Sequence, residues 1–138
     1  MNVLSILSDK GVIKPDDIAA ITKEAQDTQM TVPAVLEKRG ISARVVNVHT
    51  IKPIDEKTII EAAKDCGAIV TAEEHQLFGG FGSAVCEVLA QKLPVPVEMV
   101  GVNDTFGESG NAMDLMKTYH LKDADIITAV EKVLKRKK

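Results

Sequence analysis

Short apolar runs alternate with stretches of helical spacing from about residue 42 to the end of the chain. Each run is too short for a helix and is rich in β-branched residues, which predicts buried strands. The strands are expected at 43–48, 68–72 and 97–102, and the helices at 56–64, 83–89, 112–119 and from Asp123 onward. Because helices separate the strands, the crossovers should be right-handed and the sheet mainly parallel. We therefore expect an α/β fold, a three-layer α/β/α domain with a sheet of three to four strands, preceded by a small helical segment.

The first 40 residues have a different pattern, with several helix boundaries close together. Residues 3–7 before Gly11 predict a short amphipathic helix. A second helix is expected from Pro15, and a third covers 34–38 and ends at Gly40. Residues 3–7 also fit a strand that joins the sheet, because periodicity cannot separate the two over five residues. Both interpretations remain open.

The apolar run at 68–72 is followed directly by three titratable residues, then by a glycine loop and a helix. The candidate site consists of Glu73, Glu74, His75, Gly79, Gly80 and Gly82. Paired carboxylates beside an imidazole suit acid/base chemistry, and a glycine loop at a helix start suits a phosphate. However, the GGFG sequence matches neither dinucleotide-binding nor phosphate-loop spacing. We favour a structural role, in which His75 caps the loop and the glycines permit a tight turn.

Composition and charge narrow the function classes. The chain has 138 residues, 45% of them hydrophobic and 27% charged, which fits one globular domain. Its net charge of −3 gives no reason to expect a nucleic-acid partner. No apolar run approaches the roughly 20 residues that span a bilayer, and no signal sequence is evident, so we expect a cytoplasmic protein without a membrane partner. Cys66 and Cys86 should stay reduced, and the three histidines lack metal-ligand spacing.

Three motifs stand in order in the α/β part of the chain. They are residues 46–55 (VNVHTIKPID), residues 71–75 (TAEEH) with 79–84 (GGFGSA), and residues 104–110 (DTFGESG). Together they resemble the carboxy-terminal domain of transketolases, most closely the short carboxy-terminal subunit of split transketolases. The resemblance covers residues 41–136.

Transketolases transfer ketol units between sugar phosphates with thiamine diphosphate and a divalent metal, which two other domains bind. The resemblance therefore implies that this chain holds no catalytic, cofactor-binding or metal-binding residue. It also implies that a pyrimidine-binding domain or a partner subunit lies next to this chain. We expect a non-catalytic structural or assembly domain with no activity alone. One alternative is the C-terminal part of a working transketolase that is active only with partner domains. Another is a nucleotide-binding module that uses the Gly79 loop or the amino-terminal helices.

The amino-terminal segment carries a second resemblance. Its pattern LxxxGxI followed by VLxxxGIS is formed by Leu7, Gly11, Ile13, Val35, Leu36, Gly40, Ile41 and Ser42. It resembles the N-terminal helical module of type II secretion and type IV pilus assembly ATPases. Since transketolases have a strand and a helix here, we expect a chimera, engineered or recombined, with a helical segment at 1–40 and an α/β domain at 41–138. A chimera of this kind predicts one of three outcomes. Residues 3–7 act as the missing strand, the remaining strands move together to close the sheet, or two chains pair their sheet edges as a homodimer.

Overall fold

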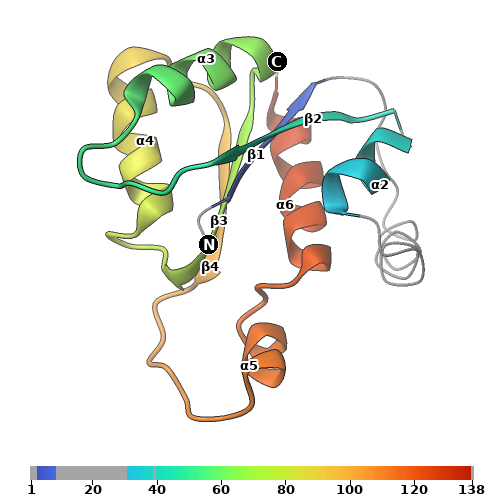
Figure 1. Ribbon diagram of the computed structural model, residues 1–138, viewed down its shortest axis with the longest axis vertical. Coiled ribbons are helices and arrows are strands. Elements are labelled where there is room, and N and C mark those ends of the chain that lie inside the picture. The colour runs from blue at the N-terminus through green and yellow to red at the C-terminus, as the bar shows by residue number, and fades with distance from the viewer. Residues whose placement is uncertain (1–2, 9–30, 39, 138) are drawn as a thin grey trace.

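The computed structural model describes residues 3–8, 31–38 and 40–137 as a mixed α/β fold (Figure 1). The elements, in chain order, are β1 (Val3–Ser8), α2 (Val32–Lys38), β2 (Ser42–Asn47), α3 (Glu56–Cys66), β3 (Ile69–Gln76), α4 (Phe81–Lys92), β4 (Val97–Val102), α5 (Ala112–Thr118) and α6 (Asp123–Arg136). The strands and helices expected beyond residue 42 are confirmed to within a few residues, and so is the helix at 34–38. The helix expected from Pro15 lies outside the described residues.

β1 settles the question that the sequence left open for residues 3–7. The strand order is β2-β1-β3-β4, and β1 pairs antiparallel with both of its neighbours. Ser5, for example, lies opposite Val45 of β2 and Val70 of β3. The expected helix is therefore wrong and the strand is confirmed. The physical reason is that pairing on both sides satisfies the backbone groups of β1, whereas a helix of this length is marginal by itself.

The sheet is mainly parallel, as expected. β3 and β4 pair in parallel, and β2 runs in the same direction because β1 is antiparallel to both β2 and β3. Three of the four described strands thus share one direction. The homodimer suggested by an incomplete sheet stays a prediction.

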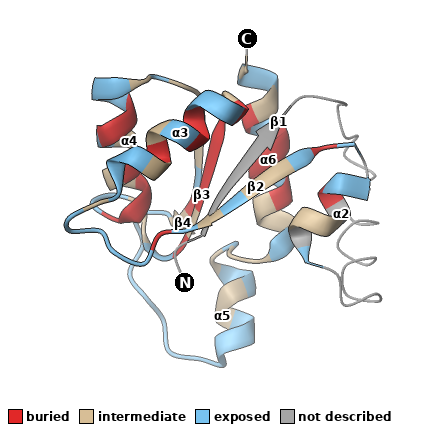
Figure 2. Cartoon of the chain, turned by 45° about the horizontal axis from the view of Figure 1, so that its top comes forward, coloured by how far each residue is buried: buried red, intermediate tan, exposed pale blue. Residues whose placement is uncertain are grey.

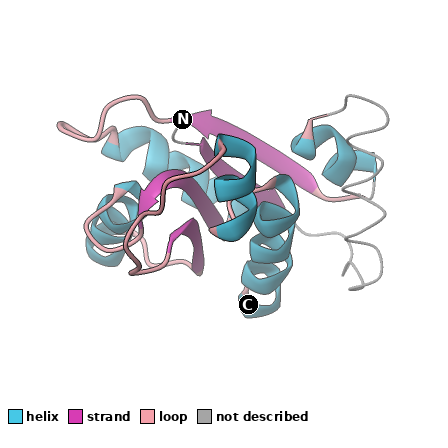
Figure 3. Cartoon of the chain, turned by 90° about the horizontal axis from the view of Figure 1, so that it is seen from below, coloured by secondary structure: helices cyan, strands magenta, loops and turns pink. Residues whose placement is uncertain are grey.

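Helices cover both faces of the sheet (Figure 3). On one face, α3 and α4 bury Ile59 and Val85 against Ile69 of β3. On the other face, α6 buries Val130 against Val70 of β3, and Leu36 of α2 joins the same cluster. Adjacent residues of β3 thus face opposite layers and are both fully buried, which explains the continuous apolar run. The three-layer arrangement is confirmed, and Figure 2 shows the buried positions concentrated where the helices meet the sheet.

The β4–α5 loop and α5 stand apart from these layers, beyond the end of the sheet where β4 stops (Figure 1). α5 has no buried residue, and residues 103–110 are all exposed. Within the described ranges, no helix combines the length and the apolar character needed to cross a bilayer.

Candidate functional site

Glu73 binds the start of α4 from inside the domain. Its carboxylate is buried and accepts two short hydrogen bonds, from the Phe81 N–H to Oε2 at 2.6 Å and from the Gly82 N–H to Oε1 at 2.7 Å. Alternation along β3 places this carboxylate there, because residues 69, 71 and 73 project toward α4. The two donors are the first residues of α4, after the N-cap Gly80.

The carboxylate occupies the position where an external anion would bind. The amino terminus of a helix carries about half a positive charge and free amide donors, and both attract anions. Here Glu73 neutralises that charge and takes two of the donors. A phosphate could reach the Phe81 and Gly82 amides only by displacing a carboxylate that belongs to the same chain. The arrangement is that of a side-chain cap across eight residues rather than an open anion site.

The glycines of the loop let the chain come close enough for this cap. A Cβ at Gly80 would lie 2.5 Å from Glu73 Oε2 and 2.2 Å from a backbone oxygen. A Cβ at Gly82 would lie 2.7 Å from the Thr71 hydroxyl oxygen. Gly79 has a φ of +75°, in the left-handed region that favours glycine. The expected structural role of the glycines, a tight turn and close packing, agrees with this geometry.

His75 does not have the role expected for it, because Ser83 and Glu73 make the contacts that hold the loop. The hydroxyl of Ser83 donates to Leu77 O at 2.6 Å and accepts from the Gly79 N–H at 3.1 Å, so it closes the loop. His75 is exposed, and its Nδ1 lies 3.2 Å from the carbonyl oxygen of the next residue, Gln76. The loop is therefore capped by Glu73 and not by His75. A carboxylate with two oxygens matches two adjacent amides better than an imidazole.

The six candidate residues do not converge on one reactive centre. Glu73 is buried against α4, whereas Glu74 and His75 are exposed. The two carboxylates thus do not share a proton-transfer site. The sequence missed the role of Glu73, although one signal was present: an acidic residue at a β3 position facing the next helix, just before a glycine loop.

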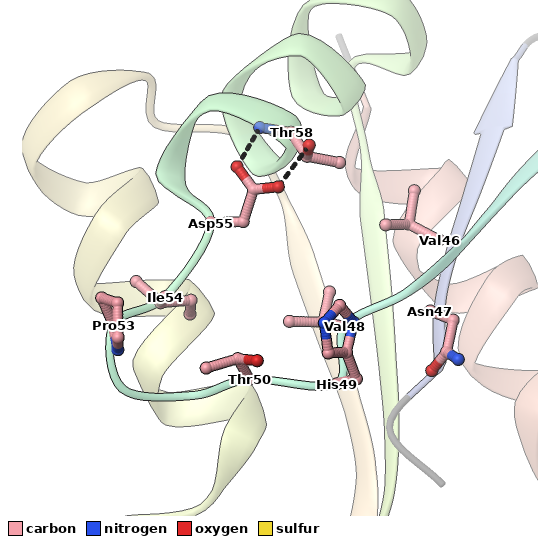
Figure 4. Close-up of a pocket in the computed structure, with 9 residues that line it drawn as sticks. All are labelled: Val46, Asn47, Val48, His49, Thr50, Pro53, Ile54, Asp55 and Thr58. Atoms are coloured by element: carbon pink, nitrogen blue, oxygen red, sulfur yellow. Dashed lines mark hydrogen bonds between the residues drawn. The ribbon is translucent and has the colours of Figure 1, made fainter.

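A cavity of about 460 Å³ lies between the end of β2 and the start of α3 (Figure 4). The residues that line it are Val46, Asn47, Val48, His49, Thr50, Pro53, Ile54, Asp55 and Thr58. Asp55 caps α3 by accepting from the Thr58 N–H at 3.0 Å and from the Thr58 hydroxyl at 2.7 Å. The Thr58 backbone hydrogen bond, followed by that of its side chain, holds the pKa of Asp55 below its ordinary value. The sequence did not reveal this cavity, because it forms only when β2 and α3 meet.

Three features of the described residues concern metal, thiol and diphosphate chemistry. Among residues 3–8, 31–38 and 40–137, no group of three His, Cys, Asp or Glu side chains could hold a metal ion. Burial raises the pKa of the thiols of Cys66 and Cys86, which favours their protonated form. The helix start that best suits a diphosphate is filled by Glu73. The start of α4 is thus not open to an external diphosphate in the described structure.

The chain is similar to several known proteins. A family model for the C-terminal domain of transketolase matches residues 13–126. The putative transketolase C-terminal section of Methanocaldococcus jannaschii is 38% identical over 129 residues, which cover 92% of this chain and 40% of that protein. The 6-deoxy-6-sulfo-D-fructose transketolase subunit SqwH of Clostridium sp. (strain MSTE9) is 44% identical over 102 residues, 74% of this chain and 32% of that one.

A solved structure described as "Split gene transketolase, inactive beta4 tetramer" has 43% sequence identity and a TM-score of 0.72. The match covers 86% of this chain and 37% of that chain.

These matches bear on two expectations. The chain spans only 32% to 40% of the length of these relatives. The family match begins at residue 13, inside the segment that was expected to be a separate helical module. Nothing in these similarities supports a secretion-ATPase module or a chimera.

Proposed function

Because this chain belongs to the transketolase C-terminal domain family, we propose that it is the structural, non-catalytic domain of a transketolase-type enzyme and has no activity alone. The reaction would be a ketol transfer that depends on thiamine diphosphate and a divalent metal. Both would be bound by other domains, in the same polypeptide or in a partner subunit. The relatives named above include transketolase subunits and sections, which supports a partner of this kind.

The observation that carries the proposal is the occupied start of α4. In an open α/β sheet, ligands bind outside the carboxyl ends of the strands, where helix amino termini face them. At β3 this place is filled by the carboxylate of Glu73. The glycine loop, which offered the best motif for a nucleotide or diphosphate, thus serves the packing of β3 against α4.

Calorimetry tests the absence of cofactor binding. Thiamine diphosphate with Mg²⁺ is titrated into the 138-residue chain, and we expect no saturable heat. Saturable binding that disappears when Mg²⁺ is chelated would overturn the proposal. Inorganic pyrophosphate is the matched control, because it reports an anion site without the thiamine.

A hybrid protein tests the structural role. In it, this chain replaces the matched 129 residues of the Methanocaldococcus jannaschii protein. If the domain docks onto the rest of that polypeptide, the hybrid should unfold in a transition coupled to the remainder. A hybrid in which this domain unfolds at the temperature of the isolated chain, or one that does not fold, would refute the structural role.

A further inference from the structure

Two sulfur atoms meet where α4 packs against β4, and the proposed function uses neither of them. The thiol sulfur of Cys86 on α4 lies 3.9 Å from the thioether sulfur of Met99 on β4. Both residues are within reach of solvent, since Cys86 is partly exposed and Met99 is 36% exposed. We call these two residues the sulfur pair.

The packing of β4 against α4 places the sulfur pair. Gly82 and Cys86 are one helical turn apart, so they lie on the same side of α4. The sulfur of Met99 lies 2.8 Å from the position that a Cβ of Gly82 would occupy. A side chain at residue 82 would therefore push Met99 away from the helix. The glycine allows the Met99 sulfur to lie against α4, next to Cys86.

A buried hydroxyl group lies beside the pair. Thr71 of β3 is opposite Met99 in the β3–β4 register and is fully buried. Its Oγ1 lies 2.7 Å from the same Gly82 Cβ position that the Met99 sulfur approaches. Among the described residues, no group forms a hydrogen bond with this hydroxyl. Because an unsatisfied buried hydroxyl costs free energy, Thr71 is suited to a polar ligand that enters beside Met99.

The two sulfur atoms suit a soft metal ion of low coordination number. Thiolate and thioether ligands favour Cu(I), whereas structural Zn²⁺ takes four ligands. With metal–sulfur bonds of about 2.3 Å, as in zinc–thiolate sites, a sulfur–sulfur distance of 3.9 Å corresponds to an angle of about 115° at the metal. The sulfur pair therefore has the spacing of two ligands of one ion, and Cu(I) would take the place of the thiol proton.

Burial favours a monovalent ion over a divalent one at this place. It raises the pKa of the Cys86 thiol, because it disfavours a bare thiolate. Cu⁺ bound to one thiolate and one neutral thioether gives a complex without net charge, which does not carry that penalty. A divalent ion would leave one positive charge uncompensated beside the sheet.

We propose that Cys86 and Met99 form a binding site for Cu(I). The ion bonds to the Cys86 sulfur and releases the thiol proton to solvent, so that Cys–SH and Cu⁺ give Cys–S–Cu and H⁺ without a change of oxidation state. The Met99 sulfur donates a lone pair to the ion, and its carbon–sulfur bonds stay intact. The Thr71 hydroxyl can hydrogen-bond to a third ligand of the ion. This site does not depend on the proposed function.

Competition with ferrozine, a weak chromogenic chelator of Cu(I), measures the site. The reduced 138-residue chain is titrated without oxygen into the coloured complex, and the loss of absorbance reports the transfer of copper. We expect one equivalent of Cu(I) to move to each chain. X-ray absorption should then show two sulfur neighbours at about 2.3 Å from the copper. An equal concentration of Zn²⁺ should not displace the ion.

Four variants locate the site. Cys86→Ser removes the thiolate and should lower the affinity by about 100-fold or more, and Met99→Leu keeps the volume but removes the thioether and should lower it by about 10-fold. The matched controls are Cys66→Ser and Met113→Leu, the other cysteine and an exposed methionine of α5. Both should stay within about twofold of wild type. Circular dichroism verifies that each variant is folded, and Cys86→Ala is used if Cys86→Ser is not.

Three results would overturn the site. If the wild-type chain takes no Cu(I) from ferrozine, the sulfur pair is only a packing contact. Equal affinities of Met99→Leu and Met113→Leu would mean that copper binds without the thioether. Half an equivalent of copper per chain, with a dimer mass by light scattering, would mean that two chains share the ion through two thiolates. The proposed function is tested separately, because the cofactor titration and the hybrid are measured without copper.

Discussion

Substituting Glu73 by glutamine tests whether the carboxylate is the structural cap of α4. The variant keeps the size of the side chain but removes its charge and one acceptor. In the wild type, both oxygens accept from adjacent amides, those of Phe81 and Gly82, at 2.6 and 2.7 Å. Glutamine can satisfy only one of them, and its NH₂ group must face the other N–H.

The expected loss follows from three contributions. A hydrogen bond to a charged group contributes about 1.5–3 kcal/mol, and an unpaired buried donor costs about 1–3 kcal/mol. The lost attraction between the carboxylate and the helix dipole adds up to about 2 kcal/mol in partly buried sites. These contributions overlap, because the same two amides provide the hydrogen bonds and the local dipole. We expect Glu73→Gln to lower the free energy of unfolding by about 2–4 kcal/mol.

Urea unfolding followed by far-ultraviolet circular dichroism measures this difference. Glu74→Gln is the matched control, since Glu74 is the exposed neighbour with the same chemistry. It should change the free energy of unfolding by less than about 0.5 kcal/mol. If Glu73→Gln were as stable as the control, the Glu73 carboxylate would not stabilise the start of α4, and its role as the structural cap would be refuted.

Four further substitutions test the loops and the helix starts. Gly80→Ala should destabilise the domain by about 2–4 kcal/mol in the same assay, because its Cβ would lie 2.2 Å from the carbonyl oxygen that ends β3. Gly107→Ala should be close to neutral, because its Cβ would meet no atom within 4 Å. Tyr119→Phe should change overall stability by less than about 1 kcal/mol but speed hydrogen exchange of the Glu108 amide several-fold, and unchanged exchange would show that the loop is held by other contacts. The pKa of Asp55 is lowered in the folded chain, so its stabilising effect is present above the unfolded value of about 3.9 and is lost as the pH falls through the folded one. Urea midpoints should therefore fall less steeply with acid in Asp55→Asn than in wild type, and parallel curves would contradict this assignment.

The sequence by itself determined the elements whose buried residues recur at a regular spacing along the chain. The spacing of residues 126, 127, 130, 133 and 134 predicts the inner face of α6. Ile127, Val130 and Val133 are fully buried, whereas Ile126 and Leu134 are partly buried. The position of Asp55 before a helix predicts a cap, and the cap is present. The three ordered motifs also identified the transketolase C-terminal family, since each combines residue types at a fixed spacing.

Only the tertiary structure decided how distant segments complete one another. Residues 3–8 form a strand because β2 and β3 leave a place between them, and a run of this length has no decisive period of its own. Glu73 is a helix cap because α4 begins within reach of its two oxygens. In both cases the outcome depends on hydrogen-bond partners that lie elsewhere in the chain. Local pattern shows which groups need such partners, and only the packed fold shows which ones they find.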